Sequence, residues 1–200
     1  NEMGGCTITG VCGKNPVVAC VQDELVCDMI ALAVAVKETG KEKSLAAEKI
    51  TDGLFTTLTN VNFDEKSIME LDKSVKELTI EIGGKLDIIA QTELFHGETD
   101  IISLRSTLLF GLRGMAAYAH HARMLGKRDQ TVDNWFIKGM SEMVVEKSIE
   151  EWLTLLMEFG QINYKCMELL DYANTSEYGN PVPNEVPLSI EKGPFIVISG

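Results

Sequence analysis

Residues 103–126 read SLRSTLLFGLRGMAAYAHHARMLG, and this stretch decides the fold class. Apolar and small residues recur in it at alternating steps of four and three, which is the spacing of one face of a helix that packs against other helices. The face comprises Leu104, Leu108, Gly111, Met115, Tyr118, Ala122 and Leu125. The pattern predicts one long helix, with Asp100 as its N-cap and Gly126 at its end.

The same helical period continues on both sides of this stretch. It predicts five further helices, over residues 15–40, 44–60, 64–84, 129–145 and 148–172. The first begins with a capping asparagine and a proline, Asn15 and Pro16, and the last begins with a Ser148–Glu151 capping box. The predicted buried faces are Val18, Val21, Leu25, Leu32 and Val36 in the first helix, and Trp152, Leu156, Phe159, Cys166 and Leu170 in the last.

These helices predict an all-α fold of two three-helix bundles in tandem. A loop over residues 1–14 precedes the first bundle, residues 15–84, and a linker over 85–99 leads to the second, residues 100–173. Residues 174–200 are predicted to be a turn-rich loop followed by a strand, PFIVISG. Several glycines lie inside the predicted helices: Gly53, Gly111, Gly114, Gly139 and Gly160. In GLRGMAAYAHHA, residues 111–122, the glycines and alanines predict close approach of a neighbouring helix, with close approach to a cofactor as the alternative.

Composition excludes several classes of function. The formal net charge of −12 argues against binding nucleic acid, whose phosphates an acidic surface repels. No apolar run approaches the ~18 residues of a membrane span, so no membrane association is expected. Five cysteines without a small-scaffold pattern favour a reducing, cytoplasmic compartment. The chain begins at Asn1 without methionine and ends just after an apolar run, so we expect a piece of a longer protein.

The glycine-rich start, GGCTITGVCGKNP over residues 4–16, carries the strongest chemical signal. Iron–sulfur clusters are held by four thiolates, and free backbone N–H groups bond to their sulfurs. Cys6 and Cys12 lie in such a loop, and the predicted helix at Pro16 directs its positive end towards it. Two cysteines cannot complete a cluster. The residues alone therefore leave two interpretations: half of a ligand set, or two unrelated small thiols.

The remaining candidate ligands are weaker. Cys27 would lie about 16 Å along the first helix from its start, too far to join Cys6 and Cys12, so it is predicted to be a buried apolar side chain. Cys20 is also predicted to be buried. The adjacent His120 and His121 point about 100° apart on a helix, which predicts one exposed and one partly buried imidazole rather than a metal site. His96, in the linker, has no spaced partner.

Four stretches resemble the hybrid-cluster proteins, also called prismane proteins or hydroxylamine reductases. They are GGCTITGVCGKNP, SLRSTLLFGLRGMAAYAHHARMLG, MELLDYANTSEYGNPVPNEV and GPFIVISG, and the resemblance runs from about residue 4 to residue 200. It implies that residues 1–14 are a truncated cluster-binding loop and that the chain is an N-terminal electron-relay domain. Family members have CxxC, seven or eight residues, then two cysteines separated by five residues. Cys6 and Cys12 match the last two cysteines, in the spacing of members from strict anaerobes.

The resemblance implies two cofactors in the parent protein. Cys6 and Cys12 would supply two of four ligands of a [4Fe–4S] cluster, and the first pair would lie upstream of Asn1. A hybrid iron–sulfur–oxygen cluster would be held by two following α/β domains, which the strand at the end of this chain would begin. The parent activity would be reduction of hydroxylamine to ammonia or of nitric oxide, with electrons from a redox partner protein. The fragment alone is expected to be inactive and without a cluster.

Two other interpretations stay open. The chain could be a stand-alone helical interaction or scaffold domain without a metal, or an unrelated metalloprotein that uses Cys6, Cys12 and Cys20. Sequence upstream of Asn1 would distinguish them, because the electron-relay interpretation requires a CxxC pair there.

Overall fold

A computed structural model describes residues 12–197 and confirms the all-α fold class, because these residues form helices and no strand. The elements are α1 (Pro16–Thr39), α2 (Lys43–Thr56), α3 (Glu65–Glu81), α4 (Gln91–Leu94), α5 (Thr99–Met124), α6 (Gln130–Ser141), the 3₁₀ helix η1 (Glu142–Val144) and α7 (Ile149–Tyr178). Each of the six predicted helices is present. None of the helices within the described residues is long and apolar enough to cross a membrane.

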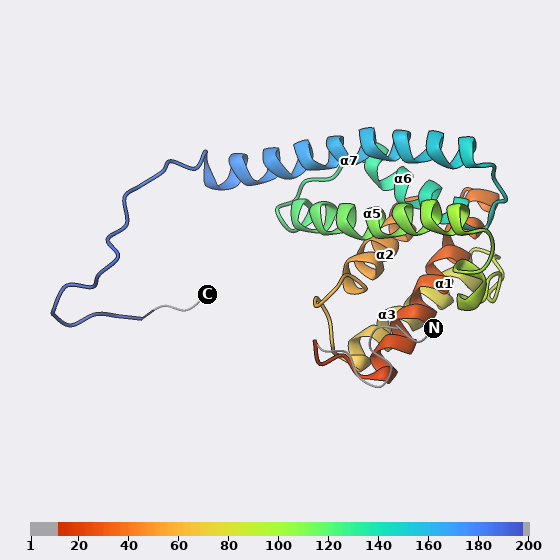
Figure 1. Cartoon of the computed structure of the whole chain (residues 1–200), viewed down its shortest axis with the longest axis horizontal. Helices are drawn as coiled ribbons and strands as arrows, with labels where there is room; N and C mark the ends of the chain where they lie inside the picture. The colour runs from red at the N-terminus through yellow and green to blue at the C-terminus, as the bar shows by residue number, and fades with distance from the viewer. Residues whose placement is uncertain (1–11, 198–200) are drawn as a thin grey trace.

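Helix α1 is the most enclosed element, because α2, α3 and α6 all pack against it (Figure 1). The five side chains predicted to form its buried face are all buried. In the middle of α1 burial extends beyond this face, since Met29, Ala33 and Ile30 also have no exposed surface. A helix buried on several sides has a fixed position, so α1 provides a rigid base for the residues just before it.

Most of the predicted helix starts are confirmed. Asn15 Oδ1 accepts a hydrogen bond from the backbone N–H of Val18 at 2.8 Å, and Ser148 and Glu151 form the reciprocal capping box. Asp64 and Asp129 also cap their helices. The N-cap predicted at Asp100 is wrong. Helix α5 already begins at Thr99, so Asp100 lies in its first turn, where a carboxylate still interacts favourably with the positive helix end.

Helices α5 and α7 pack along their length through the predicted faces. On α5, Leu108, Met115 and Ala122 are buried, and on α7, Trp152 and Cys166 are buried. A Cβ at Gly111 would overlap the ring of Phe159, so this glycine allows α7 to approach α5. Gly53, beside Met29, and Gly139 are also in close contact with neighbouring side chains. The prediction of close approach is wrong at Gly114, where a Cβ would meet nothing within 4 Å.

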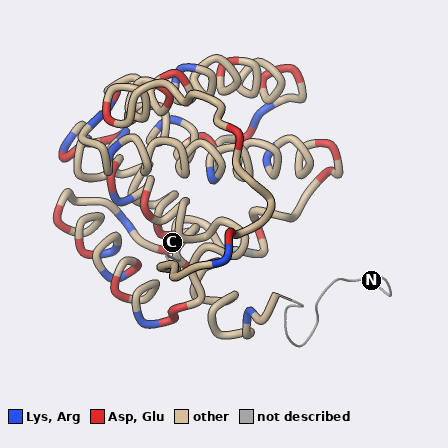
Figure 2. Tube along the Cα trace, turned by 90° about the vertical axis from the view of Figure 1, so that its left-hand side faces the viewer, with Lys and Arg blue, Asp and Glu red and all other residues tan. Residues whose placement is uncertain are grey.

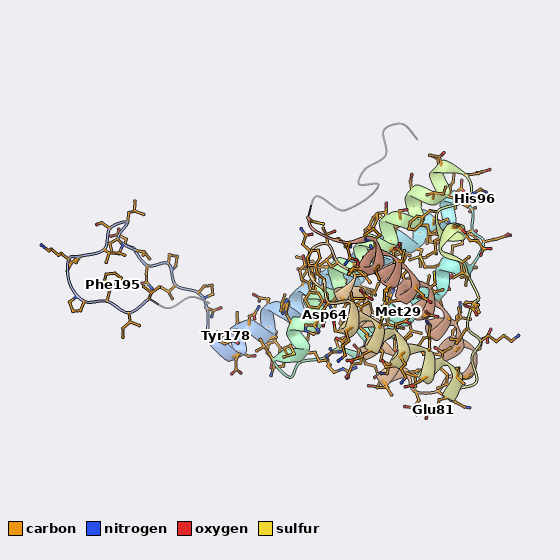
Figure 3. All side chains as sticks on the ribbon, turned by 90° about the horizontal axis from the view of Figure 1, so that it is seen from below. Met29, Asp64, Glu81, His96, Tyr178 and Phe195 are labelled. Atoms are coloured by element: carbon orange, nitrogen blue, oxygen red, sulfur yellow. The ribbon has the colours of Figure 1, made fainter. Side chains whose placement is uncertain are left out.

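The buried side chains of the described residues join into one cluster. It includes Leu25 and Ile50 from the first set of helices and Leu108, Phe136 and Trp152 from the second. Figure 3 shows Met29 within this helical body, whereas Tyr178 and Phe195 lie outside it. The division into bundles at 15–84 and 100–173 stays a prediction, because the core runs across it.

Two connecting segments differ from the sequence-based expectation. The predicted linker contains the short helix α4, and Leu94 on it is buried against the core. Helix α7 continues to Tyr178, beyond its predicted end near residue 172, and Gly179 with φ 77° follows it. The segment after α7 extends away from the body in Figure 1. The terminal strand stays a prediction, since residues 194–197 form no strand and a strand needs a hydrogen-bonded neighbour.

Candidate functional site

The predicted ligand Cys12 lies in a turn immediately before α1, and its side chain is exposed. Gly13 follows with φ 91°, a left-handed conformation that glycine adopts without strain. Asn15 then caps α1 and Pro16 is its first residue. The sequence therefore places an accessible thiol three residues before the cap of a rigid helix. The other predicted ligand, Cys6, lies outside the described residues.

The other cysteines are not equivalent to Cys12. Cys166 is fully buried, as predicted, and burial raises the pKa of its thiol to about 12. Cys27 is half-buried, and burial together with the nearby Asp28 carboxylate raises its pKa to about 11. Metal ligands must be thiolates, so these two side chains are poor candidates.

The prediction that Cys20 is buried is wrong, because its side chain is exposed. It lies two residues beyond the buried Val18, hence about 200° around α1 from the buried face. Within residues 12–197, no three His, Cys, Asp or Glu side chains are placed so that they could hold a metal ion.

A cavity of about 430 Å³ lies between α1, α3 and the segment that joins α3 to α4. Cys20 and Cys27 both line it, as do the charged residues Glu24, Asp28, Lys76 and Asp87. Carboxylates outnumber ammonium groups on its wall, so the cavity is acidic. This cavity was not expected from the sequence, although an aspartate at position 28 next to a long apolar run is a recognisable signal of a buried charge.

At the floor of this cavity, α1 and α3 share a buried charge cluster. Lys76 Nζ lies 2.6 Å from Asp72 Oδ2, 3.4 Å from Asp28 Oδ2 and 3.3 Å from Glu24 Oε1. The side chains of Asp28 and Asp72 are 7% and 10% exposed. Burial, followed by the hydrogen bond to Asp72 and its charge, raises the pKa of Asp28 to about 7, although Lys76 opposes this. The single positive charge of Lys76 thus compensates the negative charges of the two buried carboxylates only in part.

A second polar cluster joins α2 to α5. His120 Nδ1 lies 3.0 Å from Asp52 Oδ1, and the guanidinium of Arg123 also contacts that oxygen. The His120 ring stacks on Phe55 with ring centroids 4.6 Å apart. His120 is partly buried and His121 exposed, as predicted. The imidazole of His120 is already engaged by the carboxylate of Asp52 and by stacking on Phe55. We therefore interpret this cluster as a contact that holds α2 against α5.

The fold and site define a class of protein: an all-helical domain whose first, buried helix is preceded by an exposed cysteine in a glycine-rich turn. The profile of the Prismane/CO dehydrogenase family matches residues 2–200. The chain therefore belongs to that family.

Proteins named hydroxylamine reductase are similar to nearly the whole chain. Those of Maridesulfovibrio salexigens, Thermodesulfovibrio yellowstonii and Methanocella arvoryzae are 38%, 36% and 36% identical to it, over 98% of its residues. The chain spans 41% of the length of the first and 42% of the other two. These relatives therefore contain further regions in addition to the part that matches.

Proposed function

We propose that this chain is the N-terminal electron-relay domain of a hydroxylamine reductase that acts in the reducing cytoplasm. Cys6 and Cys12 would supply two of the four thiolates of a [4Fe–4S] cluster. Membership of the Prismane/CO dehydrogenase family supports this, as do relatives named hydroxylamine reductase that match almost every residue. The observation that carries the proposal is the exposed thiol of Cys12 directly before a capped, rigid helix.

The residues around Cys12 suit such a ligand. Gly13 turns the chain without strain, and Asn15 and Pro16 start α1 so that its positive end lies towards the loop. That end favours the negative charge of thiolate-bound iron. When bound, the cluster would pass single electrons from a redox partner to the active centre of the whole protein. This chain alone offers two of the four thiolates, so we expect it to bind no complete cluster.

The catalytic centre would lie in the rest of the parent protein. It would be a hybrid iron–sulfur–oxygen cluster held by two α/β domains, with hydroxylamine or nitric oxide as substrate. The outward face of α7 would contact those domains. It carries a stripe of exposed apolar side chains spaced by three, four or seven residues: Ile149, Leu153, Met157, Tyr164 and Met167. A soluble domain rarely leaves such a continuous face uncovered.

The test compares two cysteine variants of the full-length protein prepared without oxygen. Cys12→Ser should abolish the electron paramagnetic resonance signal of the cubane cluster and lower its iron and sulfide content. Cys20→Ser is the matched control, because Cys20 is an exposed thiol on α1 that the electron-relay interpretation does not use as a ligand. The cluster signal and the iron and sulfide content of Cys20→Ser should equal those of the wild type. An unchanged signal in Cys12→Ser, or a lost signal in Cys20→Ser, would contradict the ligand assignment.

A further inference from the structure

The turn that carries Cys12 contacts a buried amide, that of Gln22 on α1. Gln22 is only 4% exposed. Its Oε1 accepts a hydrogen bond at 2.6 Å from Nζ of Lys14, which follows Cys12 by two residues. Its Nε2 donates to the backbone carbonyls of Asn62 at 3.0 Å and of Thr56 at 3.4 Å. A buried amide needs partners for its oxygen and for both N–H groups, and Gln22 has all three.

These contacts continue from Gln22 to the start of α3. Asn62 lies between α2 and α3, and its own side chain is held, because Nδ2 donates to Ser67 Oγ at 3.0 Å and Oδ1 accepts from the N–H of Asp64 at 2.8 Å. Asp64 is the N-cap of α3. The hydrogen bonds therefore connect Lys14 through Gln22 to a fixed helix start. We call the hydrogen bond between Lys14 and Gln22 the loop tether.

A neutral amide is an unusual partner for a lysine in this chain, which has 30 acidic and 18 basic residues. Acidic side chains are distributed along the helices in Figure 2. Lys14 nevertheless makes no ion pair with any described residue, and its side chain is partly buried. A lysine that only balanced surface charge would lie in solvent beside a carboxylate. The contact of Lys14 with Gln22 therefore fixes the position of the turn and does not neutralise a charge.

We propose that Lys14 and Gln22 are positioning residues for the [4Fe–4S] cluster: the loop tether holds the Cys12 turn in place before iron binds and slows the loss of iron afterwards. This inference rests on the proposed function. Successive α carbons are 3.8 Å apart, so those of Cys12 and Lys14 are separated by at most about 7.6 Å. Fixing Lys14 therefore restricts the region that the Cys12 thiol can reach. A ligand already held near its bound position loses less conformational freedom on binding, so it binds the metal more tightly.

Iron release from the full-length protein, prepared without oxygen, tests the loop tether. The iron chelator ferrozine is added, and the decay of the cubane electron paramagnetic resonance signal is followed. Lys14→Met removes the donor but keeps the apolar stem, and its signal should decay about tenfold faster than that of the wild type, the effect of losing one charge-assisted hydrogen bond. Lys14→Arg keeps a cationic donor and should restore the wild-type rate. Lys66→Met is the matched control: it removes an ammonium group from a side chain that is 85% exposed on the first turn of α3, and should decay like the wild type.

Two further measurements separate the tether from charge and from general stability. Gln22→Met leaves the charge of Lys14 intact but removes its acceptor, so the signal should again decay faster, and adding Lys14→Met to it should cause no further acceleration, because both residues make one contact. The melting temperature of Lys14→Met should equal that of the wild type. An unchanged decay rate in Lys14→Met, an equal acceleration in Lys66→Met, no rescue by Lys14→Arg or a lower melting temperature of Lys14→Met would overturn the inference. A wild-type cubane signal that survives Cys12→Ser would instead refute the proposed function, and the inference with it.

Discussion

Replacing Asp28 by asparagine is expected to remove most of the decrease in stability that the folded chain shows between pH 5 and pH 8. Asp28 on α1 faces Asp72 and Lys76 on α3, Glu24 one turn earlier on α1, and the cavity that Asp87 and the Cys27 thiol also line. Asp72 Oδ1 is buried and accepts no hydrogen bond from the described residues. A proton on Asp28, or the amide of an asparagine, can supply that bond.

The sign follows from the raised pKa. In the unfolded chain Asp28 loses its proton near pH 3.8, and in the folded chain near pH 7. The folded state therefore holds a proton that the unfolded state has released, so the free energy of unfolding decreases as the pH rises through this window. A pKa difference of one pH unit corresponds to about 1.4 kcal/mol, which gives about 4 kcal/mol as an upper limit. Because the cluster adjoins an open cavity, we expect about 1–3 kcal/mol.

The measurement is urea unfolding at pH 5, 6, 7 and 8. The wild type should lose stability along this series, whereas Asp28→Asn should lose less and be the more stable of the two at pH 8. Glu77→Gln is the matched control: it removes an exposed carboxylate from α3, 66% exposed, and should keep the wild-type slope. The reasoning would be refuted if the free energy of unfolding of Asp28→Asn decreased with pH as steeply as that of the wild type, or if this variant were less stable than the wild type at pH 8.

Two further predictions concern the packing of α5 and the exposed face of α7. Gly111→Ala should destabilise the chain by about 1–3 kcal/mol in urea unfolding, because its Cβ would overlap the Phe159 ring. Gly114→Ala, three residues away with free space at its Cβ, should instead stabilise it by up to about 1 kcal/mol; equal effects would contradict the packing argument. Met157, 71% exposed on the apolar face of α7, should bind hydrophobic dyes. Met157→Glu should lower dye fluorescence without lowering the melting temperature, and unchanged fluorescence would mean that this face is not the exposed apolar surface.

Local sequence signals predicted the helices well because their causes are local. The Asn15 cap, the Ser148–Glu151 box and the stop at Gly40 each act within one turn, and all three are present. The buried faces of α1 and α5 were predictable for the same reason. Asp100 was misassigned as a cap because a carboxylate is favourable both at the N-cap and within the first turn, and the sequence does not distinguish the two positions.

The sites that sequence reasoning missed depend on contacts between distant residues. Asp28 meets Asp72 and Lys76 across more than 40 residues of chain. Helical periodicity says which face of a helix is buried, but not which helix covers it. The exposure of Cys20 was missed for the same reason, since it depends on what packs against the start of α1.

Helix α1 carries both the proposed ligand loop and the buried carboxyl, yet the two are electrostatically separate. Asp28 follows Pro16, the first residue of α1, by 12 residues, so about 18 Å of helix lies between it and the start of α1. This exceeds the Debye length of about 8 Å at physiological salt. Ionisation of Asp28 therefore acts through the packing of α1 on α3 and not through its field at Cys12. Because α2 and α6 also hold α1 in place, the helix should keep its position with or without iron at Cys12. The pH dependence of unfolding and the loss of the cluster signal thus report on two independent features of one helix.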